Sequence, residues 1–379
     1  MEKSLRSGLR TWIEIDKKAI AHNYRVFRSL IPKRTKLCGV VKSNAYGHYL
    51  IDFARELEKN KVDYLAADSA VEGLSLRRAG IKTPLLIFGY TLPEMILPAH
   101  EAGVEITISN FDYFVEINKL KLSKPIRVHI KVDTGFHRHG FQAHEMKKVM
   151  SEIVKNKKIE VVGLYTHFAA AKNPAFTQTT QNQIDIFNQW REAFNQAGLK
   201  VISHACATAG TIIYPESHFD MVRVGIGLYG YWPSKETKAF AVDKFQLKPV
   251  LSWRTVVGEV KRIKAGERIG YDFTEKFEQD SAIAILPIGY WHVFPRALSS
   301  IGHVLIKGKR VKIMGRVCMD IVMVDVTDIK NIKVGDEVTI IGRDGKKEIT
   351  PNDIAELVDG SSEYETITRI NPLIKRIYI

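Results

Sequence analysis

One lysine stands where an apolar run gives way to small and polar residues. Lys42 follows the run 37–41 and begins the segment Lys-Ser-Asn-Ala-Tyr-Gly-His. A lysine in such a place, with no acidic neighbour along the chain, can have a lowered pKa and form a Schiff base with a carbonyl compound. The same position also fits an ordinary strand-end lysine whose amine reaches water.

A second polar segment, residues 131–140, crowds Lys131, Asp133 and Arg138 directly after another apolar run. Such a group indicates an anion site or an ion-pair network. His137 and His139 lie in the same segment, but no cysteine or carboxylate completes a known metal-ligand spacing. We therefore expect no metal site here.

A third segment, Arg223-Val-Gly-Ile-Gly, carries an arginine followed by closely spaced glycines. Glycines after a late strand of a barrel leave backbone N–H groups accessible, and barrel enzymes commonly bind a phosphate there. Gly225-Ile226-Gly227 fits a tight turn equally well.

Short apolar runs followed by helix-like stretches must position these residues. Eight such runs recur about every two dozen residues, the length of a βα unit. They cover residues 37–41, 64–67, 84–88, 104–108, 126–132, 161–166, 201–205 and 221–224. Amphipathic stretches such as 51–59 and 181–197 separate them. The pattern predicts a (β/α)8 TIM-type barrel over about residues 36–232, with a doubly wound open sheet as the alternative.

The pattern changes after Pro249. Alternating, β-branched runs appear at 250–263, 282–285, 304–306, 321–326 and 337–341, and glycines separate them. This predicts a mostly-β C-terminal domain. The alternating segment 11–15 is expected to join that domain, and Asp16 to cap a helix ending near Leu30. We expect residues 1–15 to be an N-terminal strand, 16–240 the barrel and 241–379 the β domain.

The composition excludes several classes of protein. The chain has 379 residues, an apolar fraction of 45% and three cysteines, too few for a disulfide framework. It has no apolar run long enough to span a membrane, and its first residues lack the apolar core of a signal peptide. We therefore expect a cytoplasmic protein with no membrane partner.

The net charge is unusual, because 56 basic and 42 acidic residues give +14. Lysines occur in short clusters, for example at 155–158, without interleaved aromatic residues. Such clusters are typical of a solvated surface rather than of a platform for nucleic acid. We expect no nucleic-acid partner, and an anionic small molecule remains the favoured ligand.

Taken together, these segments resemble the alanine racemase family, the fold-type III pyridoxal-phosphate enzymes, from about residue 12 to residue 378. The matching motifs follow in the family's order. They are Val-Val-Lys42-Ser-Asn-Ala-Tyr46-Gly-His, Lys131-Val-Asp-Thr-Gly-Phe-His-Arg138, Tyr165-Thr-His167-Phe, Arg223-Val-Gly-Ile-Gly, Gly270-Tyr271, Pro287-Ile-Gly-Tyr290 and Gly315-Arg-Val-Cys318-Met319-Asp320.

The resemblance implies an amino-acid racemase that interconverts L- and D-alanine and supplies D-alanine for peptidoglycan. Lys42 would hold pyridoxal 5′-phosphate as an aldimine and act as one base, and Tyr271 would be the second base. A phenol is a poor base near pH 7 unless neighbouring cations favour the phenolate, and His167 could take part in that path. In the family this tyrosine comes from the other subunit, so a homodimer with active sites at the interface is implied.

The resemblance also implies roles for residues around the cofactor. Arg223 matches the donor to the pyridine nitrogen, and His167 a histidine that stacks on the ring. Arg138 matches a residue near the substrate carboxylate, and Lys131 a lysine often carbamylated in the family. Tyr46, Thr208, Gly225, Ile226 and Tyr364 match the phosphate-binding residues, whereas Met319 and Asp320 match residues lining the substrate.

Two departures concern the substrate range. Ala207-Thr208 stands where the family usually has Asn-Ser, and Trp291-His292 replaces a small acidic turn near the entrance with bulk and an imidazole that could be cationic. The alternatives are therefore a broad-specificity, serine or lysine racemase of the same fold, or a cofactor-binding regulator without catalysis. A basic-amino-acid decarboxylase fits Tyr271 and Arg223 less well.

Overall fold

The computed structural model describes residues 6–379, which form two compact units. The barrel unit comprises Lys18–Ala45 and Leu50–Lys248. The β unit comprises the described residues up to Lys17, then Tyr46–Tyr49 and Pro249–Ile379. Each unit has its own core and is described by itself.

Eight parallel strands form a nearly closed barrel in the order β8-β7-β6-β5-β4-β3-β2-β9. They are β2 (Lys36–Val40), β3 (Tyr64–Ala67), β4 (Leu85–Ile87), β5 (Glu105–Ile108), β6 (Ile126–Lys131), β7 (Ile159–Tyr165), β8 (Ile202–His204) and β9 (Met221–Val224). Single backbone hydrogen bonds, from Asp220 to Ser203 (3.0 Å) and from Arg223 to Cys206 (2.9 Å), connect β8 to β9. The predicted (β/α)8 barrel is confirmed.

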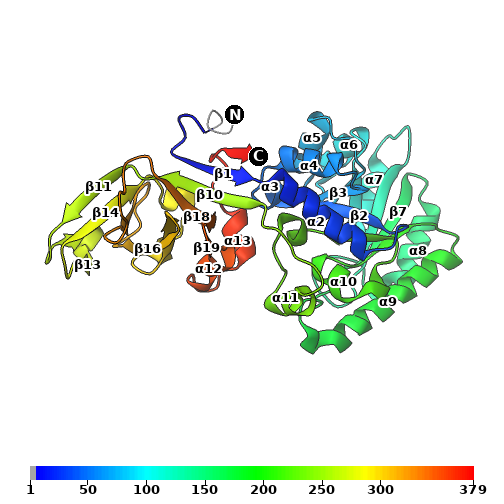
Figure 1. Ribbon diagram of the computed structural model, residues 1–379. Helices are drawn as coiled ribbons and strands as arrows, with labels where there is room; N and C mark the ends of the chain where they lie inside the picture. Colours follow the sequence, from blue (N-terminus) through cyan, green and yellow to red (C-terminus); the bar gives the residue numbers. More distant parts are fainter. Residues whose placement is uncertain (1–5) are drawn as a thin grey trace. The chain divides into compact units, whose positions relative to one another are not determined.

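Helices surround these strands (Figure 1). They are α2 (Lys17–Leu30), α4 (Leu50–Lys59), α5 (Ala70–Arg78), α6 (Pro93–Glu101), α7 (Asp112–Lys119), α8 (Met146–Lys155), α9 (Thr177–Gln196), α10 (Thr208–Ile213) and α11 (Lys235–Ala241). The longest, α9, buries Ile184, Phe187, Trp190 and Phe194 along one face. That spacing follows the 3.6-residue period of the helix, so α9 covers the strands with an apolar stripe.

The interior of the barrel is apolar except for a few ionisable side chains. Strands covered on both sides are expected to be continuously apolar. Glu105, His129, His204 and Arg223 are exceptions, since each lies on a barrel strand and is at most 4% exposed. Buried groups of this kind need hydrogen-bond partners.

A left-handed turn follows Lys42 directly. In α3 (Lys42–Tyr46), Ser43, Asn44 and Ala45 have φ between 51° and 56°. A left-handed backbone conformation costs about 1–2 kcal/mol at each residue that is not glycine. The Glu72 carboxylate accepts hydrogen bonds from the backbone N–H groups of Asn44 and Asp68, both at 3.0 Å, and so ties the turn to the end of β3. The sequence pattern gave no sign of this turn.

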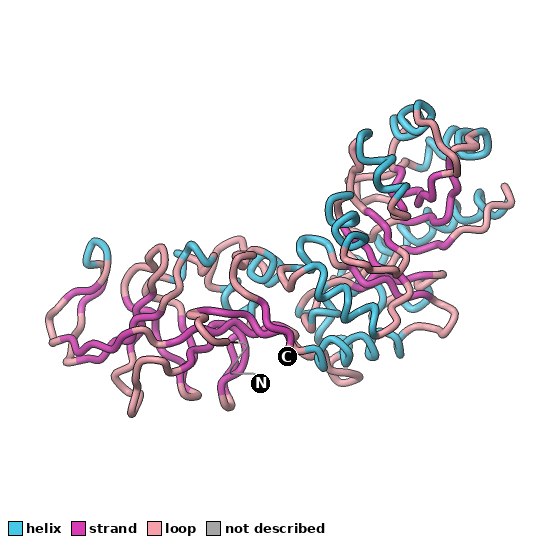
Figure 2. Tube along the Cα trace, turned by 90° about the horizontal axis from the view of Figure 1, so that it is seen from above, coloured by secondary structure: helices cyan, strands magenta, loops and turns pink. Residues whose placement is uncertain are grey.

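The β unit contains a ten-stranded sheet in the order β11-β14-β17-β16-β15-β18-β10-β1-β20, with β19 paired to β18. Figure 2 shows these strands in magenta. They are β1 (Thr11–Ile15), β10 (Leu251–Val256), β11 (Glu259–Ile263), β14 (Ser281–Leu286), β15 (His303–Ile306), β16 (Lys309–Met314), β17 (Val322–Asp325), β18 (Glu337–Asp344), β19 (Lys347–Ile349) and β20 (Arg376–Tyr378). Strand β1 lies between β10, to which it is antiparallel, and β20, to which it is parallel.

A hairpin, two helices and one strand boundary that differs from the prediction complete the description of the β unit. A hairpin of β12 (Arg268–Ile269) and β13 (Glu275–Lys276) stands apart from the large sheet, and helices α12 (Pro351–Glu356) and α13 (Glu363–Thr368) precede β20. The single run expected at 250–263 is two strands, because the pairing with β1 and β18 is interrupted at Val257–Gly258 and the following residues pair with β14 instead.

The segment Tyr46–Tyr49 packs within the β unit although it follows the lysine turn in sequence. Gly47 has φ +81°, and a Cβ placed on it would lie 2.3 Å from the Ile367 carbonyl oxygen. Its own carbonyl accepts a 3.0 Å hydrogen bond from Nε of Arg376, and the Tyr378 hydroxyl donates to the His48 carbonyl at 2.7 Å. Only glycine fits at position 47 without a shift of the backbone.

Among residues 6–379, no helix is both long and apolar enough to cross a bilayer. The same part of the chain holds no group of three or more metal-binding side chains. Cys38, Cys206 and Cys318 are all free thiols.

Candidate active site

Four cationic side chains gather at the carboxyl ends of the barrel strands. Lys42 follows β2, Lys131 ends β6, Arg138 lies in the next loop and Arg223 is on β9. Burial, followed by the charges of Arg138, Arg223 and Lys42, lowers the pKa of Lys131 to about 8. The cations are therefore close enough to repel one another, and the site favours an anion.

His167, in the loop after β7, lies within the electrostatic influence of the same cations. Burial, together with Arg223, Arg138, Lys131 and Lys42, lowers the pKa of His167 well below its usual value. Its imidazole is therefore neutral at pH 7. The ring lies 3.4 Å from a guanidinium nitrogen of Arg223 (Nδ1 to Nη2) and packs edge-on against Phe136. A neutral, flat ring at this point suits stacking on a planar ligand.

Carboxylates at the site do not balance these charges. Asp68 lies 3.6 Å from the Lys42 amine (Oδ1 to Nζ), although the sequence around Lys42 shows no acidic residue. Lys42 therefore has an acidic partner in space although none lies near it in the sequence, because Asp68 directly follows the adjacent strand β3. The Asp133 carboxylate accepts three backbone N–H groups of its own loop, from Gly135, Phe136 and His137.

Arg223 is held from several sides and is only 3% exposed. Its Nη2 donates to the carbonyls of Thr166 and Ala205, both at 2.8 Å, and its Nη1 donates to His204 Nδ1 at 2.8 Å. A guanidinium remains protonated in proteins, so Arg223 presents a fixed positive charge and fixed donors.

Backbone amides converge on Thr208, the first residue of α10. The N–H groups of Gly225 and Gly227 point to the Thr208 hydroxyl at 3.2 and 3.4 Å, and Ile226 begins the 3-10 turn η4 (Ile226–Tyr229) between them. A Cβ on Gly227 would lie 2.3 Å from the Phe27 ring. Backbone amides clustered beside a hydroxyl are typical of anion-binding sites.

The two tyrosines expected at the phosphate lie together in the β unit. The rings of Tyr46 and Tyr364 are 6.4 Å apart between centroids. Burial, and then the nearby Tyr46 phenol, raises the pKa of Tyr364. The Tyr364 phenol therefore stays protonated and can donate a hydrogen bond to an anion.

Tyr271 projects from a strained turn of the β unit. It begins the 3-10 turn η5 (Tyr271–Phe273) between β12 and β13, where Gly270, Asp272 and Phe273 all have positive φ. An ion pair between Arg316 and Asp272 fixes the turn. The Tyr271 side chain is 66% exposed.

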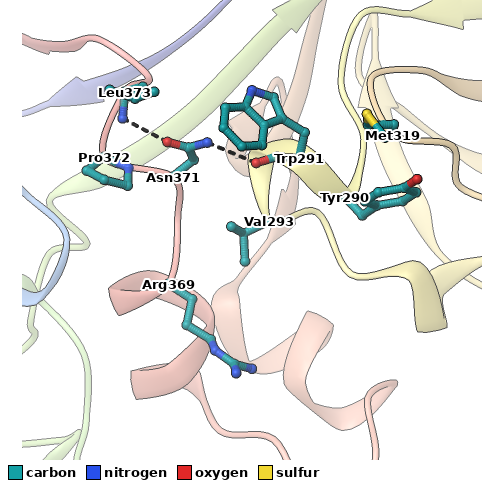
Figure 3. A pocket seen from close by; sticks show the side chains of 8 residues that line it. All are labelled: Tyr290, Trp291, Val293, Met319, Arg369, Asn371, Pro372 and Leu373. Atoms are coloured by element: carbon teal, nitrogen blue, oxygen red, sulfur yellow. Dashed lines mark hydrogen bonds between the residues drawn. The ribbon is translucent and has the colours of Figure 1, made fainter.

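A groove of about 560 Å³ lies in the β unit (Figure 3). Its lining is mostly apolar and comprises Tyr290, Trp291, Val293, Met319, Arg369, Asn371, Pro372 and Leu373. Asn371 connects the two sides, because its amide donates to the Trp291 carbonyl and accepts from the Leu373 N–H, both at 2.9 Å. Met319 is 55% exposed there.

The prediction that His292 could be cationic is wrong. Its side chain is buried, its Nδ1 accepts a 3.1 Å hydrogen bond from the Gly289 N–H, and burial lowers its pKa. The imidazole is therefore neutral at pH 7 and supports the turn. Asp320 lies 4.0 Å from it and is mostly exposed.

The structure thus divides the predicted site residues between the units. The barrel unit brings together Lys42, Lys131, Arg138, His167, Thr208, Arg223, Gly225 and Ile226. The β unit carries Tyr46, Tyr271, Met319, Asp320 and Tyr364. The sequence interpretation missed Asp68 and Glu105; an acidic residue inside the apolar run 104–108 was the available signal for Glu105.

The fold and site define a (β/α)8-barrel enzyme with a lysine-bearing, anion-binding centre and an additional β unit. Two family models match the chain, described as alanine racemase, N-terminal domain (residues 15–233) and alanine racemase, C-terminal domain (residues 250–378). The chain therefore belongs to the alanine racemase family, and with it to the racemases, a class of isomerase.

Individual relatives cover nearly the whole chain. Alanine racemases of Methanococcus maripaludis and Clostridium perfringens strain SM101 are each 38% identical over 372 residues, which span 97% of this chain and 98% and 95% of theirs. The solved alanine racemase of Clostridium difficile 630 superposes with a TM-score of 0.91 at 33% identity, covering 98% and 96% of the two chains. That of Bacillus anthracis with bound L-Ala-P gives 0.91 at 33% identity, covering 98% and 95%.

Proposed function

We propose that this chain interconverts L-alanine and D-alanine with pyridoxal 5′-phosphate bound to Lys42. The observation that carries the proposal is the group of four cations around the neutral His167 in the barrel unit. A cofactor phosphate and a substrate carboxylate supply the negative charge that this group lacks. The relatives named above as alanine racemases support alanine as the substrate.

The residues present fit this cofactor. The Thr208 hydroxyl and the amides beside it suit the phosphate, and His167 offers a neutral ring to stack on. Arg223 would face the ring nitrogen as a donor that keeps its proton. When bound, the cofactor supplies an electron-withdrawing ring that makes the substrate Cα proton acidic. A donor that keeps its proton limits that withdrawal, which favours prompt return of a proton to Cα.

Two residues would exchange the Cα proton on opposite faces. The Lys42 amine accepts it on one face, and the nearby Asp68 carboxylate stabilises the resulting ammonium. The Tyr271 hydroxyl serves the other face from a second copy of the chain. Its exposure, and the exposed apolar groove of the same unit, support a homodimer.

Lys131 would act on the substrate through Arg138. An amine with a pKa near 8 is partly uncharged at pH 7–8, so it can react with carbon dioxide and release one proton. The carbamate would reverse the charge beside Arg138 and hold its guanidinium toward the substrate carboxylate. Met319 and Asp320 would line the substrate side from the partner copy.

We infer that the reaction takes place in the cytoplasm. The three cysteines of the chain are all free thiols, and two of them are buried, as expected of a protein kept in a reducing compartment.

Reductive trapping tests the proposal. The full chain loaded with pyridoxal 5′-phosphate is treated with borohydride, digested and analysed by mass spectrometry. We expect the cofactor on the peptide containing Lys42 and none in the Lys42→Ala variant. Attachment at another lysine, or no attachment in a folded wild-type chain, would contradict the proposal.

A further inference from the structure

A row of hydrogen bonds crosses the buried interior of the barrel and ends at Arg223. Glu105 on β5 lies 2.9 Å from His129 on β6 (Oε2 to Nε2). His129 Nδ1 lies 2.9 Å from Nε2 of His204 on β8, and His204 Nδ1 lies 2.8 Å from Nη1 of Arg223. Both imidazoles have no exposed surface.

The chemistry of the groups fixes the direction of every bond. Arg223 can only donate, so Nδ1 of His204 accepts and carries no proton. A proton on Nε2 of His204 then donates to Nδ1 of His129, and Nε2–H of His129 donates to Glu105. Burial and the charge of Arg223 lower the pKa of His204 well below its usual value, in agreement with a neutral ring.

A charged His129 does not fit this row. Its Nδ1 would then also donate, and Nε2 of His204 would have to accept as well as Nδ1. That would leave His204 with no proton at all, which a histidine does not adopt at ordinary pH. Both rings are therefore neutral, and the two charges of the row stand at its ends, on Glu105 and Arg223.

Glu105 remains a carboxylate despite its burial. Burial alone would raise its pKa, but the hydrogen bond from His129 and the charge and hydrogen bond of Arg127 hold the pKa below the usual value. Arg127 approaches the other oxygen at 2.8 Å and is half exposed. The two oxygens of Glu105 thus have separate partners, one inside the barrel and one at its surface.

We propose that Glu105 is a positioning residue for Arg223, acting through His129 and His204. A carboxylate strengthens the bond that it accepts, and each imidazole passes this polarisation to the next bond in the row. The row thereby holds the Arg223 guanidinium in one orientation and offsets part of its charge. The proposal rests on the proposed function, in which Arg223 faces the cofactor ring nitrogen.

Three variants of the full chain separate this role from ordinary structural support. Glu105→Gln keeps an acceptor for His129 but removes the charge, and Glu105→Leu removes both. Arg127→Gln is the matched control, because it removes the surface partner of the same carboxylate and leaves the row intact. Thermal unfolding of each variant shows whether it is folded.

The first readouts are cofactor affinity, the absorbance of the bound cofactor and steady-state kinetics. For Glu105→Gln we expect kcat to fall about 10-fold with KM within about 2-fold, and the absorbance maximum of the bound cofactor to shift. Glu105→Leu should lower kcat further and weaken cofactor binding about 10-fold. Arg127→Gln should match the wild type in all three.

The second readout needs no cofactor. Nitrogen NMR of the apoprotein labelled with ¹⁵N-histidine, assigned with His129→Gln and His204→Gln, should show both rings neutral with the proton on Nε2. An Nδ1–H tautomer or a charged ring at either position would overturn the row of bonds.

Glu105→Gln and Glu105→Leu chains that fold, bind cofactor and turn over like Arg127→Gln would overturn the positioning role. A wild-type chain that binds no cofactor at Lys42 would instead contradict the proposed function, and the NMR result would still decide the row.

Discussion

At the scale of single residues, Lys131 illustrates how the surroundings of a side chain change its pKa. The chain is rich in lysine, yet Lys131 is buried, and the charges of Arg138, Arg223 and Lys42 outweigh that of the nearby Asp133 carboxylate. The sequence placed Lys131, Asp133 and Arg138 together, because they share one strand end. It did not show that the Asp133 carboxylate accepts hydrogen bonds from backbone N–H groups of its own loop, since such bonds depend on the local backbone path.

The lowered pKa of Lys131 predicts that the stability of the folded chain depends on pH. The folded-state pKa of about 8 lies below the usual 10.5, so the unfolded chain binds more protons between these values and stability rises with pH across that window. In buffer without carbon dioxide, Lys131→Met should be more stable than wild type by about 1–3 kcal/mol at pH 7. The difference should vanish above about pH 10.5. Urea unfolding at several pH values measures it, with the exposed Lys124→Met as control; a difference independent of pH would contradict the account.

Tyr271 gives a second prediction at this scale. Because Lys42 and Tyr271 would serve opposite faces of Cα, Tyr271→Phe should lower racemisation about 10²–10⁴-fold. Lys42 would still exchange the Cα proton of one enantiomer with solvent. Proton NMR in D₂O should therefore show deuterium entering one enantiomer of alanine much faster than the other. Equal loss of exchange for both enantiomers would argue against two one-sided bases.

At the scale of elements, the barrel strands were predictable and the lysine turn was not. Parallel strands covered on both sides form apolar runs with sharp ends, and β3 and β9 have the predicted bounds. The turn after Lys42 takes left-handed backbone angles at serine, asparagine and alanine, residues that carry no glycine-like signal. Glu72, from the neighbouring βα unit, stabilises it, and that contact is not local in sequence.

Gly47, which follows this turn, gives a prediction for the segment between the turn and α4. Gly47 and Gly80 have similar angles, φ +81° and +84°, but a Cβ meets the Ile367 carbonyl at Gly47 and open space at Gly80. Gly80→Ala should cost about 1 kcal/mol for the backbone angle alone. Gly47→Ala should cost about 3–4 kcal/mol, because the clash is added. Chemical unfolding compares them, and equal costs would show that the contact with Ile367 is unimportant.

At the scale of the whole molecule, the large sheet joins distant parts of the chain. Strand β1 lies between β10 and β20, and no local pattern could name these neighbours, because the pairing depends on long-range register. The same sheet supports the segment that carries Tyr271 and the groove around Trp291. The exposure of Tyr271 and Trp291 could not be predicted from the sequence, since exposure follows from the fold.

The groove predicts an association of two copies. The wild-type chain should sediment at twice the mass of one chain, and Trp291→Glu with Leu373→Glu should shift it toward single chains and lower activity in parallel. Val71→Glu is the control, because the exposure of Val71 on the barrel unit, 66%, lies between those of Trp291 (54%) and Leu373 (79%), and Val71 is outside the groove. A fully active single chain would contradict a tyrosine supplied by a second copy.

Racemisation itself is the most direct test of the central claim. The full chain with pyridoxal 5′-phosphate is incubated separately with L-alanine and with D-alanine, and the products are followed by chiral chromatography. Both incubations should approach equal amounts of the two enantiomers, because mirror-image compounds have equal free energies, and Lys42→Ala should leave each unchanged. Wild-type chain that carries the cofactor on Lys42 but leaves either enantiomer of alanine unchanged would contradict the account.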